Sequence, residues 1–471
     1  MLEILGTRII APYYGTTVYV WSSLIGVALV GLAAGYYLGG YLSDRRNNPV
    51  IMYTFVVVAA LFTILIPAIL RTVLDVSEIF GPRFGSLFAS FALFFGFFVA
   101  LGSVTPYAVK ISADDMKHLG ITAGSLYAVS TIGGFVGAIA AGYFLIPNFG
   151  IRTIINICGI LLAIMGVSGI FLKRKNKVSA AALIFIFVML QFIFFASRSI
   201  SASGKISVLY DKSGKYGRVF VIDRGGKYRY MVVDGAVQTY IEKLDETFAS
   251  PYINMLYDAS LMHKKPKKAL VIGLGGGALD RKLRNVGVDT MNVDIDPEIV
   301  KIAKDYFGFK GEYAIADGRR FLRGTKENYD LIYFDVFNGF SVYPFMFSKE
   351  AFELAKARMD VSGILAMNVV GEPPKKNGGE LVFDDSLRNI HATLGSIFEN
   401  VYLRTAGAGG LVSYVFYASD SHLEMRDEIL ITGKGKIITD DRNTLDYDLT
   451  GLVEKWRAHN YRDFLKELPL I

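Results

Sequence analysis

The chain has 471 residues, of which 52% are hydrophobic and only 20% are charged, and its mean hydropathy is +0.38. This composition excludes an ordinary soluble protein of this size, so part of the chain is expected to lie in a lipid bilayer. The net charge of +7 does not indicate a nucleic-acid partner, because the whole excess falls among the apolar runs of the first 200 residues and the remainder is neutral.

The chain offers no pattern for a metal site or a disulfide. Its one cysteine, Cys158, lies in an apolar run, and its five histidines are scattered without the spacing of metal ligands. We therefore expect neither a bound metal nor an internal disulfide.

The first 200 residues contain six windows without a charged residue. They run over residues 9–43, 51–70, 84–109, 119–150, 153–172 and 178–197. Each holds at least the roughly 20 residues with which a helix crosses the hydrocarbon core of a bilayer. The windows predict an α-helical transmembrane bundle of about six spans. Because they contain no Asp, Glu, Lys or Arg, they favour an anchor, or a pocket for an apolar substrate, over a transport path.

Two of these windows share a repeated segment. Residues 23–38 and 130–145 match at eight of sixteen positions without a gap, and two spans lie between the copies. A period of three spans reverses the chain direction in the membrane, which is typical of a 3+3 inverted repeat. The alternative is that both copies only supply small residues for close helix packing. These residues are Gly31, Gly35 and Gly39 in the first copy, and Gly133, Gly137 and Ala141 in the second.

Beyond residue 205, short β-branched and aromatic runs replace the long apolar windows. Strand patterns over 206–210, 218–222 and 228–233 predict a small β-hairpin subdomain, which we place at residues 201–241. A helix is expected over about 242–262, and apolar strands then alternate with amphipathic helices up to residue 369. Such alternation is typical of a doubly wound parallel sheet. We therefore expect a membrane domain at 1–200 and an α/β Rossmann-like domain at 242–471.

The first of these alternating strands runs into a glycine-rich turn, Val271–Gly277. Gly273, Gly275 and Gly277 carry no side chain that would keep a ligand from the backbone. Asp294 ends the next strand about twenty residues later, where a carboxylate can accept hydrogen bonds from both hydroxyls of a ribose. The turn and the acid together predict a nucleoside-containing ligand.

The next two strand ends bring further acids to the same rim. Asp317 and Gly318 follow the third strand, and Asp335 follows the fourth. A rim of carboxylates repels a pyrophosphate but attracts a cationic sulfonium. The pattern therefore favours S-adenosylmethionine or its decarboxylated form, although a structural role for Asp317 and Asp335, such as a helix cap, stays open.

These motifs resemble those of the spermidine synthase family of aminopropyltransferases over about residues 206–447, and the whole chain resembles the membrane-fused members of that family. The similar segments are Tyr210–Ile222, Val233–Gln238, the glycine turn, Val293–Asp296, Asp317–Gly318 and the strand that ends before Asp335. The resemblance implies that Asp294 holds the ribose, Asp317 lies by the adenine and Asp335 faces the transferable chain. It also suggests Gln238, Tyr252 and Glu246 as substrate-binding residues.

Three positions depart from the family pattern. Polyamine synthases carry an aspartate within the glycine turn that helps to hold the aminopropyl amine, and here this position is Gly276. Their catalytic base lies three residues after the position of Asp335 and is Asn338 here, an amide that cannot take a proton. Their Tyr-His-Glu-Met-Leu segment is Tyr252-Ile-Asn-Met-Leu in this chain. Asp335 and the Asn338 position therefore remain as the candidate catalytic site.

The departures leave the acceptor open. A dicationic amine needs carboxylates at both ends of its groove. Candidates for the second end are Glu242, Asp245, Glu246, Glu372, Asp440 and Asp441, each of which could equally be a solvated surface charge.

Three functions are compatible with this pattern. The leading one is transfer of an aminopropyl group from decarboxylated S-adenosylmethionine to a polyamine or an amine-bearing lipid. The second is methyl transfer from intact S-adenosylmethionine to a membrane-associated substrate, because Gly276 removes an acid that would repel the cofactor's carboxylate. The third is a transporter or sensor that binds a polyamine or nucleoside without turnover. Expected partners are the lipid bilayer and a small amine or lipid but no nucleic acid, and a homodimer is compatible with the sequence.

Two considerations disagree on the side of the membrane that holds the second half. Six spans put the amino terminus and the second half on one side, whose loops hold five Lys and Arg against eight on the other. The positive-inside rule then favours an external second half, whereas an adenosyl cofactor favours the cytoplasm. We give the cofactor precedence and expect an integral protein of the cell membrane with a cytoplasmic catalytic domain.

Overall fold

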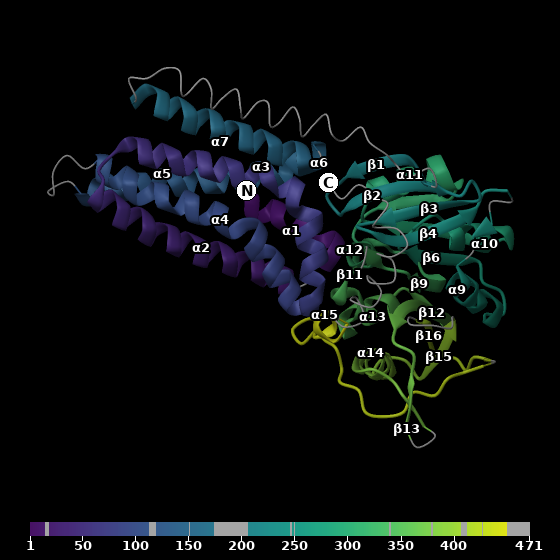
Figure 1. Ribbon diagram of the computed structural model, residues 1–471. Coiled ribbons are helices and arrows are strands. Elements are labelled where there is room, and N and C mark those ends of the chain that lie inside the picture. The colour runs from purple at the N-terminus through teal and green to yellow at the C-terminus, as the bar shows by residue number, and fades with distance from the viewer. Residues whose placement is uncertain are drawn as a thin grey trace. The chain divides into compact units, whose positions relative to one another are not determined.

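A computed structural model of the chain describes two compact units. The residues it describes are 1–14, 18–112, 119–149, 151–173, 206–244, 247–248, 250–338, 341–377, 380–406, 412–425 and 427–449. One unit is helical and lies within residues 1–204, and the other comprises Lys205–Lys212 and Tyr216–Glu467 (Figure 1). Each unit is described by itself below.

Within its described residues, the helical unit contains five helical stretches that are long and apolar enough to cross a membrane. Its elements are α1 (Leu2–Tyr14), α2 (Val18–Arg45), α3 (Pro49–Ser77), η1 (Glu78–Phe80), α4 (Gly81–Ser112), α5 (Leu119–Ile139), η3 (Ala140–Leu145), α6 (Ile146–Asn148) and α7 (Ile151–Lys173). Five of the six apolar windows thus coincide with these helices, and the window at 178–197 lies outside the described residues. In the first window, the span corresponds to α2, and α1 covers residues 2–14 before it; residues 15–17 lie outside the described residues.

The repeated small residues have different surroundings in the two copies. In the first copy, a β-carbon added to Gly35 would lie 2.4 Å from the carbonyl oxygen of Val99, and one added to Gly39 would lie 2.3 Å from that of Ser103. Backbone contact between α2 and α4 therefore requires glycine at these positions. In the second copy, a β-carbon added to Gly142, the counterpart of Gly35, would meet no described atom within 4 Å. A β-carbon on Gly133 would likewise meet no described atom, one on Gly137 would lie 3.7 Å from Cβ of Met1, and Ala141 is buried. Among the described glycines, contact with the backbone of another helix is thus found in the first copy and not in the second.

The second unit begins with a five-stranded antiparallel sheet. Its strands are β1 (Ile206–Ser213), β2 (Arg218–Arg224), β3 (Tyr228–Val233), β4 (Ala236–Glu242) and β5 (Thr247–Phe248), in that order across the sheet. The expected hairpins are present, but the helix predicted over 242–262 starts later. Glu242 still pairs with Tyr228 in the sheet, and α9 (Pro251–Met262) begins only at Pro251, whose fixed φ suits the first helical position.

A seven-stranded sheet forms the centre of this unit. Its strands are β6 (Lys268–Ile272), β7 (Asp289–Asp294), β8 (Glu312–Ile315), β9 (Tyr329–Phe334), β12 (Met359–Gly371), β15 (Asn400–Ala406) and β16 (Val412–Ser419). The order across the sheet is β15-β16-β12-β9-β6-β7-β8. The pairs β15-β16 and β16-β12 are antiparallel, and all other pairs are parallel. After β6, the chain first adds β7 and β8 on one side and then β9 and β12 on the other. The direction of winding therefore reverses between β6 and β9.

Helices connect these strands and cover both faces of the sheet. They are α10 (Ala278–Asn285), α11 (Pro297–Phe307), α12 (Gly318–Gly324), η4 (Pro344–Phe347), α13 (Lys349–Lys356), α14 (Asp385–Gly395) and α15 (Leu445–Asp448); the short strands β10 (Phe337–Asn338), β11 (Ser341–Val342), β13 (Lys375–Asn377) and β14 (Glu380–Val382) form two small hairpins. The expected doubly wound sheet is present, whereas β15, β16 and α14 were not predicted.

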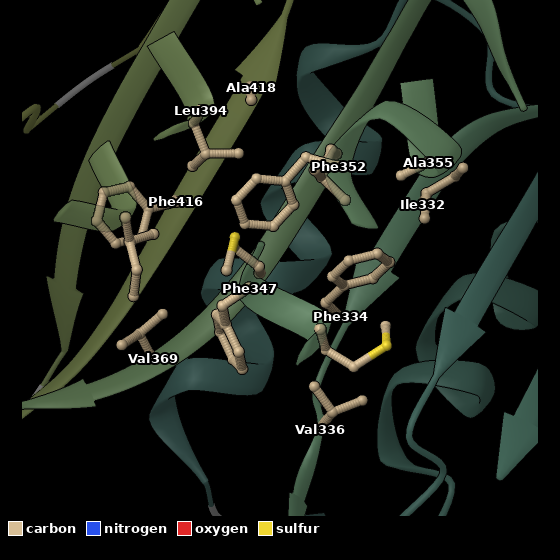
Figure 2. Packing of buried hydrophobic residues seen from close by; sticks show 14 of the residues in the cluster. Ile332, Phe334, Val336, Phe347, Phe352, Ala355, Val369, Leu394, Phe416 and Ala418 are labelled. Carbon is tan, nitrogen blue, oxygen red and sulfur yellow. The ribbon is translucent and has the colours of Figure 1, made fainter. Parts of the chain in front are cut away.

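Alternate residues of the strands pack on opposite faces. On one face, Phe334 of β9 packs with Phe347, Phe352 and Val369 (Figure 2). On the other face, residues such as Tyr333 pack against α9 and α10. Burial on both faces explains the nearly continuous apolar runs by which these strands are recognisable.

Candidate active site

A cavity of about 340 Å³ lies at the carboxyl ends of the parallel strands. The residues that follow β6, β7, β8 and β9 all contribute to its lining, as do β4, β12 and α9. The crevice where an open α/β sheet reverses its winding is the usual ligand site of this architecture. The fold therefore brings the predicted strand-end residues to one cavity.

The glycine turn after β6 is shaped by close backbone contacts. Gly273 has φ of +96°, and a β-carbon there would lie 2.0 Å from the carbonyl oxygen of Asp335. Gly275 and Gly277 also have positive φ, at +51° and +80°. A side chain at Gly273 would therefore clash with the backbone as well as strain it.

Neighbouring residues of the antiparallel sheet lie close to Gly276, at the position where the family has an aspartate. The backbone N–H of Gly276 donates to Oγ1 of Thr239 at 3.1 Å. A β-carbon on Gly276 would lie 2.5 Å from Cγ2 of Thr239 and 3.2 Å from Cε1 of Phe248. The hairpin sheet thus occupies the space that an aspartate at this position would need.

Asp294 lies at the end of β7 with both carboxylate oxygens bound to the backbone. It accepts hydrogen bonds from the N–H of Leu274 at 3.0 Å and from that of Asp296 at 2.9 Å. Burial raises the pKa of Asp294 to about 6, against the opposing effect of these two N–H donors. The carboxylate is thereby fixed beside the glycine turn, where its remaining acceptor capacity faces the cavity.

Asp317 caps a helix and also lines the cavity. Its side chain accepts from the backbone N–H of Arg320 at 2.8 Å at the start of α12, which is the structural alternative expected for this residue. Gly318 follows at the first position of α12, and a β-carbon there would lie 2.5 Å from Cγ2 of Ile272. Both residues remain at the rim of the cavity.

Asp335 is the carboxylate at the end of β9, and two side chains hold it. The hydroxyl of Tyr252 donates to its Oδ2 at 3.2 Å, and Nδ2 of Asn368 donates to its Oδ1 at 3.0 Å. Burial raises the pKa of Asp335 to about 6, while these two hydrogen bonds act in the opposite direction. A carboxylate with such a pKa is mostly ionised at neutral pH and is better matched to proton transfer than an ordinary aspartate.

Among the described lining residues, Arg319 is the one side chain with a permanent positive charge. Its guanidinium donates to the two carboxylate oxygens of Asp440 at 2.7 and 2.8 Å. The pair is bidentate and Arg319 is only 8% exposed, so its charge is already neutralised. In the described part of the cavity, acids therefore outnumber uncommitted cations.

Of the remaining predicted site residues, two line the cavity and two are described only in part or not at all. Gln238 lines the cavity from β4, and Tyr252 lines it from α9. Asn338 lies in β10, of which the structure describes the backbone at this position, and Glu246 lies outside the described residues. The sequence analysis missed Asn368 and Thr239. Asn368 carries a recognisable signal, since it is a lone amide within the apolar run of β12.

Comparison with known proteins agrees with this arrangement. Residues 250–405 match the family described as spermine/spermidine synthase domain. A polyamine aminopropyltransferase of Thermococcus onnurineus is 24% identical over 204 residues, which cover 41% of this chain and 68% of that protein. One from Archaeoglobus fulgidus is 33% identical over 163 residues, which cover 32% of this chain and 58% of that protein.

A further relative extends the similarity beyond the second unit. Polyamine aminopropyltransferase 2 of Aquifex aeolicus is 23% identical over 352 residues, which cover 68% of this chain and 66% of that protein. This share exceeds what residues 206–471 can supply, so the match includes part of the helical half. Among solved structures, spermidine synthase from Thermotoga maritima has a TM-score of 0.37 at 18% identity, covering 54% of this chain and 88% of that chain.

The strand-end acids, the glycine turn and the sequence match lie in the same segment of the chain. Residues 250–405 therefore match the spermine/spermidine synthase domain, and the chain is similar to polyamine aminopropyltransferases over this segment and, in the Aquifex aeolicus relative, over part of the helical half as well.

Proposed function

We propose that this protein transfers an aminopropyl group from decarboxylated S-adenosylmethionine to an amine. The observation that carries the proposal is the charge of the cavity: Asp294, Asp317 and Asp335 line it, while the guanidinium of Arg319 is bound to Asp440. A cationic sulfonium with a terminal amine suits this lining, because both of its charges are positive. The carboxylate of intact S-adenosylmethionine would find no uncommitted cation among the described lining residues.

In the proposed reaction, different residues bind the donor and activate the acceptor. The glycine turn admits the nucleoside close to the backbone, and Asp294 offers a fixed acceptor to the ribose hydroxyls. The donor supplies an electrophilic carbon beside a sulfonium leaving group. Asp335 holds the acceptor amine by a charge-assisted hydrogen bond and takes its proton, while Tyr252 and Asn368 fix the orientation of the carboxylate.

A second candidate function is methyl transfer from intact S-adenosylmethionine. Gly276 favours it, because the family's acid at this position would repel the cofactor's carboxylate and the contacts of Thr239 and Phe248 exclude that acid here. The same chemistry of in-line displacement would apply, with the methyl carbon as the target.

Product analysis separates the two functions. The full-length protein in detergent is incubated with an amine mixture and either decarboxylated or intact S-adenosylmethionine. We expect methylthioadenosine from the decarboxylated form, and a rate lowered by about 10²-fold to 10⁴-fold in Asp335→Asn, the range typical for loss of a general base. Asp360→Asn, an exposed residue at the other end of the sheet, is the matched control. Formation of S-adenosylhomocysteine from the intact form, without methylthioadenosine, would instead establish methyl transfer.

The helical unit supports a further part of the proposal, namely that the enzyme is embedded in the cell membrane. Its five long apolar stretches have the length and composition of membrane spans. We place the second unit on the cytoplasmic side, where adenosyl sulfonium donors are made.

A further inference from the structure

Five described carboxylates line the cavity, and their partners differ. Asp296 caps α11 through the backbone N–H of Glu298, and Asp317 caps α12. Asp280 is bonded to the side chains of Arg284, Thr290 and Asn292. Asp294 is held by backbone N–H groups beside the glycine turn, whereas Asp335 follows β9 and is held by the side chains of Tyr252 and Asn368. We assign Asp335 to the acceptor, and Asp317 to the adenine side that the family resemblance implies.

Apart from neutral polar side chains such as Tyr252, Asn368 and Ser413, the cavity has a broad apolar wall on this side of the sheet. This wall is formed by residues of β9, β12, β16 and η4 and of the segments that follow them: Val336, Phe337, Phe345, Met346, Val370 and Val412. Phe345 is 57% exposed although it lines the cavity, so an apolar surface lies at its edge. A second ammonium group bound along this wall would lose its hydration without gaining a charged partner.

The acids that could have paired with a second ammonium are committed elsewhere or lie away from the cavity. Glu242 forms an ion pair with Lys227 at 3.1 Å, and Asp440 binds Arg319. Neither acid belongs to the cavity lining, and neither does Glu372 or Asp441. Asp245 and Glu246 lie outside the described residues.

One buried acceptor beside Asp335 has no partner among the described residues. Asn368 is 3% exposed and donates from Nδ2 to Asp335, which leaves its Oδ1 without a hydrogen bond. A buried carbonyl oxygen in this state indicates a missing donor. An amine nitrogen that donates one hydrogen bond to Asp335 and another to Oδ1 of Asn368 would satisfy both.

We propose that the acceptor is a monoamine, with a single primary amine on an uncharged, apolar group. This inference rests on the proposed function. The neutral amine nitrogen forms a bond to the propyl carbon of the donor, the bond between that carbon and sulfur breaks, and its electron pair stays on sulfur to give neutral methylthioadenosine. The new secondary ammonium loses one proton to Asp335, which passes it to water. Asn368 is thus a specificity-determining residue for one amine, and the apolar wall selects what that amine is attached to.

Matched pairs of amines test the inference on the full-length protein. Methylthioadenosine formation is measured with butylamine against 1,4-diaminobutane and with hexylamine against 1,6-diaminohexane, all with decarboxylated S-adenosylmethionine. We expect kcat/KM for each monoamine to exceed that of its diamine by about tenfold or more, since the diamine must desolvate an unpaired charge. Equal or higher values for the diamines would overturn the monoamine acceptor and leave the proposed function standing. No methylthioadenosine with any amine would remove the proposed function and this inference with it.

A pair of variants provides an independent check. Phe345→Glu adds a carboxylate at the exposed edge of the apolar wall, and Phe345→Gln adds a neutral side chain of the same size. We expect Phe345→Glu, but not Phe345→Gln, to shift the ratio of kcat/KM toward the diamines by about fivefold or more. A ratio that is the same in both variants would contradict the idea that a missing second carboxylate sets the specificity.

Discussion

Asp294 and Asp335 are two buried carboxylates of one cavity, and their partners give them different roles. Burial raises the pKa of each to about 6. Backbone N–H groups hold Asp294, so it is a fixed acceptor beside the glycine turn. Asp335 is held by the side chains of Tyr252 and Asn368 and faces the acceptor wall, where a proton can leave. In the proposed reaction, the same chemical group would bind the donor in one place and serve as the base in another.

The raised pKa of Asp335 predicts how the activity depends on pH. As the pH falls through about 6, the carboxylate becomes protonated and can no longer take a proton from the amine. We therefore expect kcat/KM, which reports groups of the free enzyme, to fall on the acidic side with an inflection near pH 6. The inflection should disappear in the residual activity of Asp335→Asn and persist in Asp294→Asn. An inflection that survives Asp335→Asn would assign the titration to another group.

The position of Asp294 beside the glycine turn leads to a prediction about the affinity for the donor. Asp294→Ala should weaken binding of the sulfonium nucleoside by about 1–3 kcal/mol, because the ribose hydroxyls lose a charged acceptor. Asp289→Ala is the matched control, since Asp289 is exposed at the opposite end of the same strand. Affinity is measured by calorimetric titration, and unchanged affinity in Asp294→Ala would remove the sugar from this position.

At the scale of elements, the sequence predicted the parts whose order along the chain fixes their place in space. Strands β6, β7, β8, β9 and β12 are apolar runs bounded by helical patterns, and acids after successive parallel strands must meet at one edge of the sheet. Sequence alone could not reveal that Asp440 neutralises Arg319, because 121 residues separate the pair. It also could not reveal that Thr239 and Phe248 close the space at Gly276, since this contact joins two sheets.

Local features explain the elements that were predicted incorrectly. The helix expected from about residue 242 begins only at Pro251, because Glu242 still pairs with Tyr228 in the antiparallel sheet. Strands β15 and β16 lie beyond the last predicted strand, and they form the edge of the sheet by antiparallel pairing. The alternation of strands and helices predicts parallel pairing only, so it did not indicate these two strands.

The contact between α2 and α4 yields a prediction about the bundle. A methyl group at Gly39 would lie 2.3 Å from a backbone oxygen of α4, so Gly39→Ala must push the helices apart. We expect it to lower the apparent Tm of the helical unit in detergent, consistent with a cost of about 1–3 kcal/mol for overpacking. Gly40→Ala is the control, because a β-carbon at Gly40 meets nothing within 4 Å. Equal Tm values for the two variants would show that the helices do not pack in this way.

At the scale of the whole molecule, the chain joins a helical unit with long apolar helices to a unit whose cavity has an apolar wall, where we propose that the acceptor binds. The match to the Aquifex aeolicus relative extends over both halves, so the combination is not peculiar to this chain. A donor that is soluble in water and an acceptor with an apolar part would suit such a combination.

The orientation in the membrane can be tested in intact cells. In a Cys158→Ser background, Lys175→Cys probes the segment after α7 and Lys326→Cys probes the exposed surface of the second unit. With six spans and a cytoplasmic enzyme unit, an impermeant maleimide should label Lys175→Cys in intact cells and Lys326→Cys only after lysis. The reverse pattern would place the enzyme unit outside, as the positive-inside rule suggests.

The preference of the cavity between the two sulfonium donors tests the central claim most directly. Calorimetric titration of the full-length protein with decarboxylated and with intact S-adenosylmethionine measures it. Because acids line the cavity and Arg319 is bound to Asp440, we expect the decarboxylated form to bind about tenfold or more tightly, a difference of about 1.4 kcal/mol. Tighter binding of the intact form would contradict aminopropyl transfer by this protein.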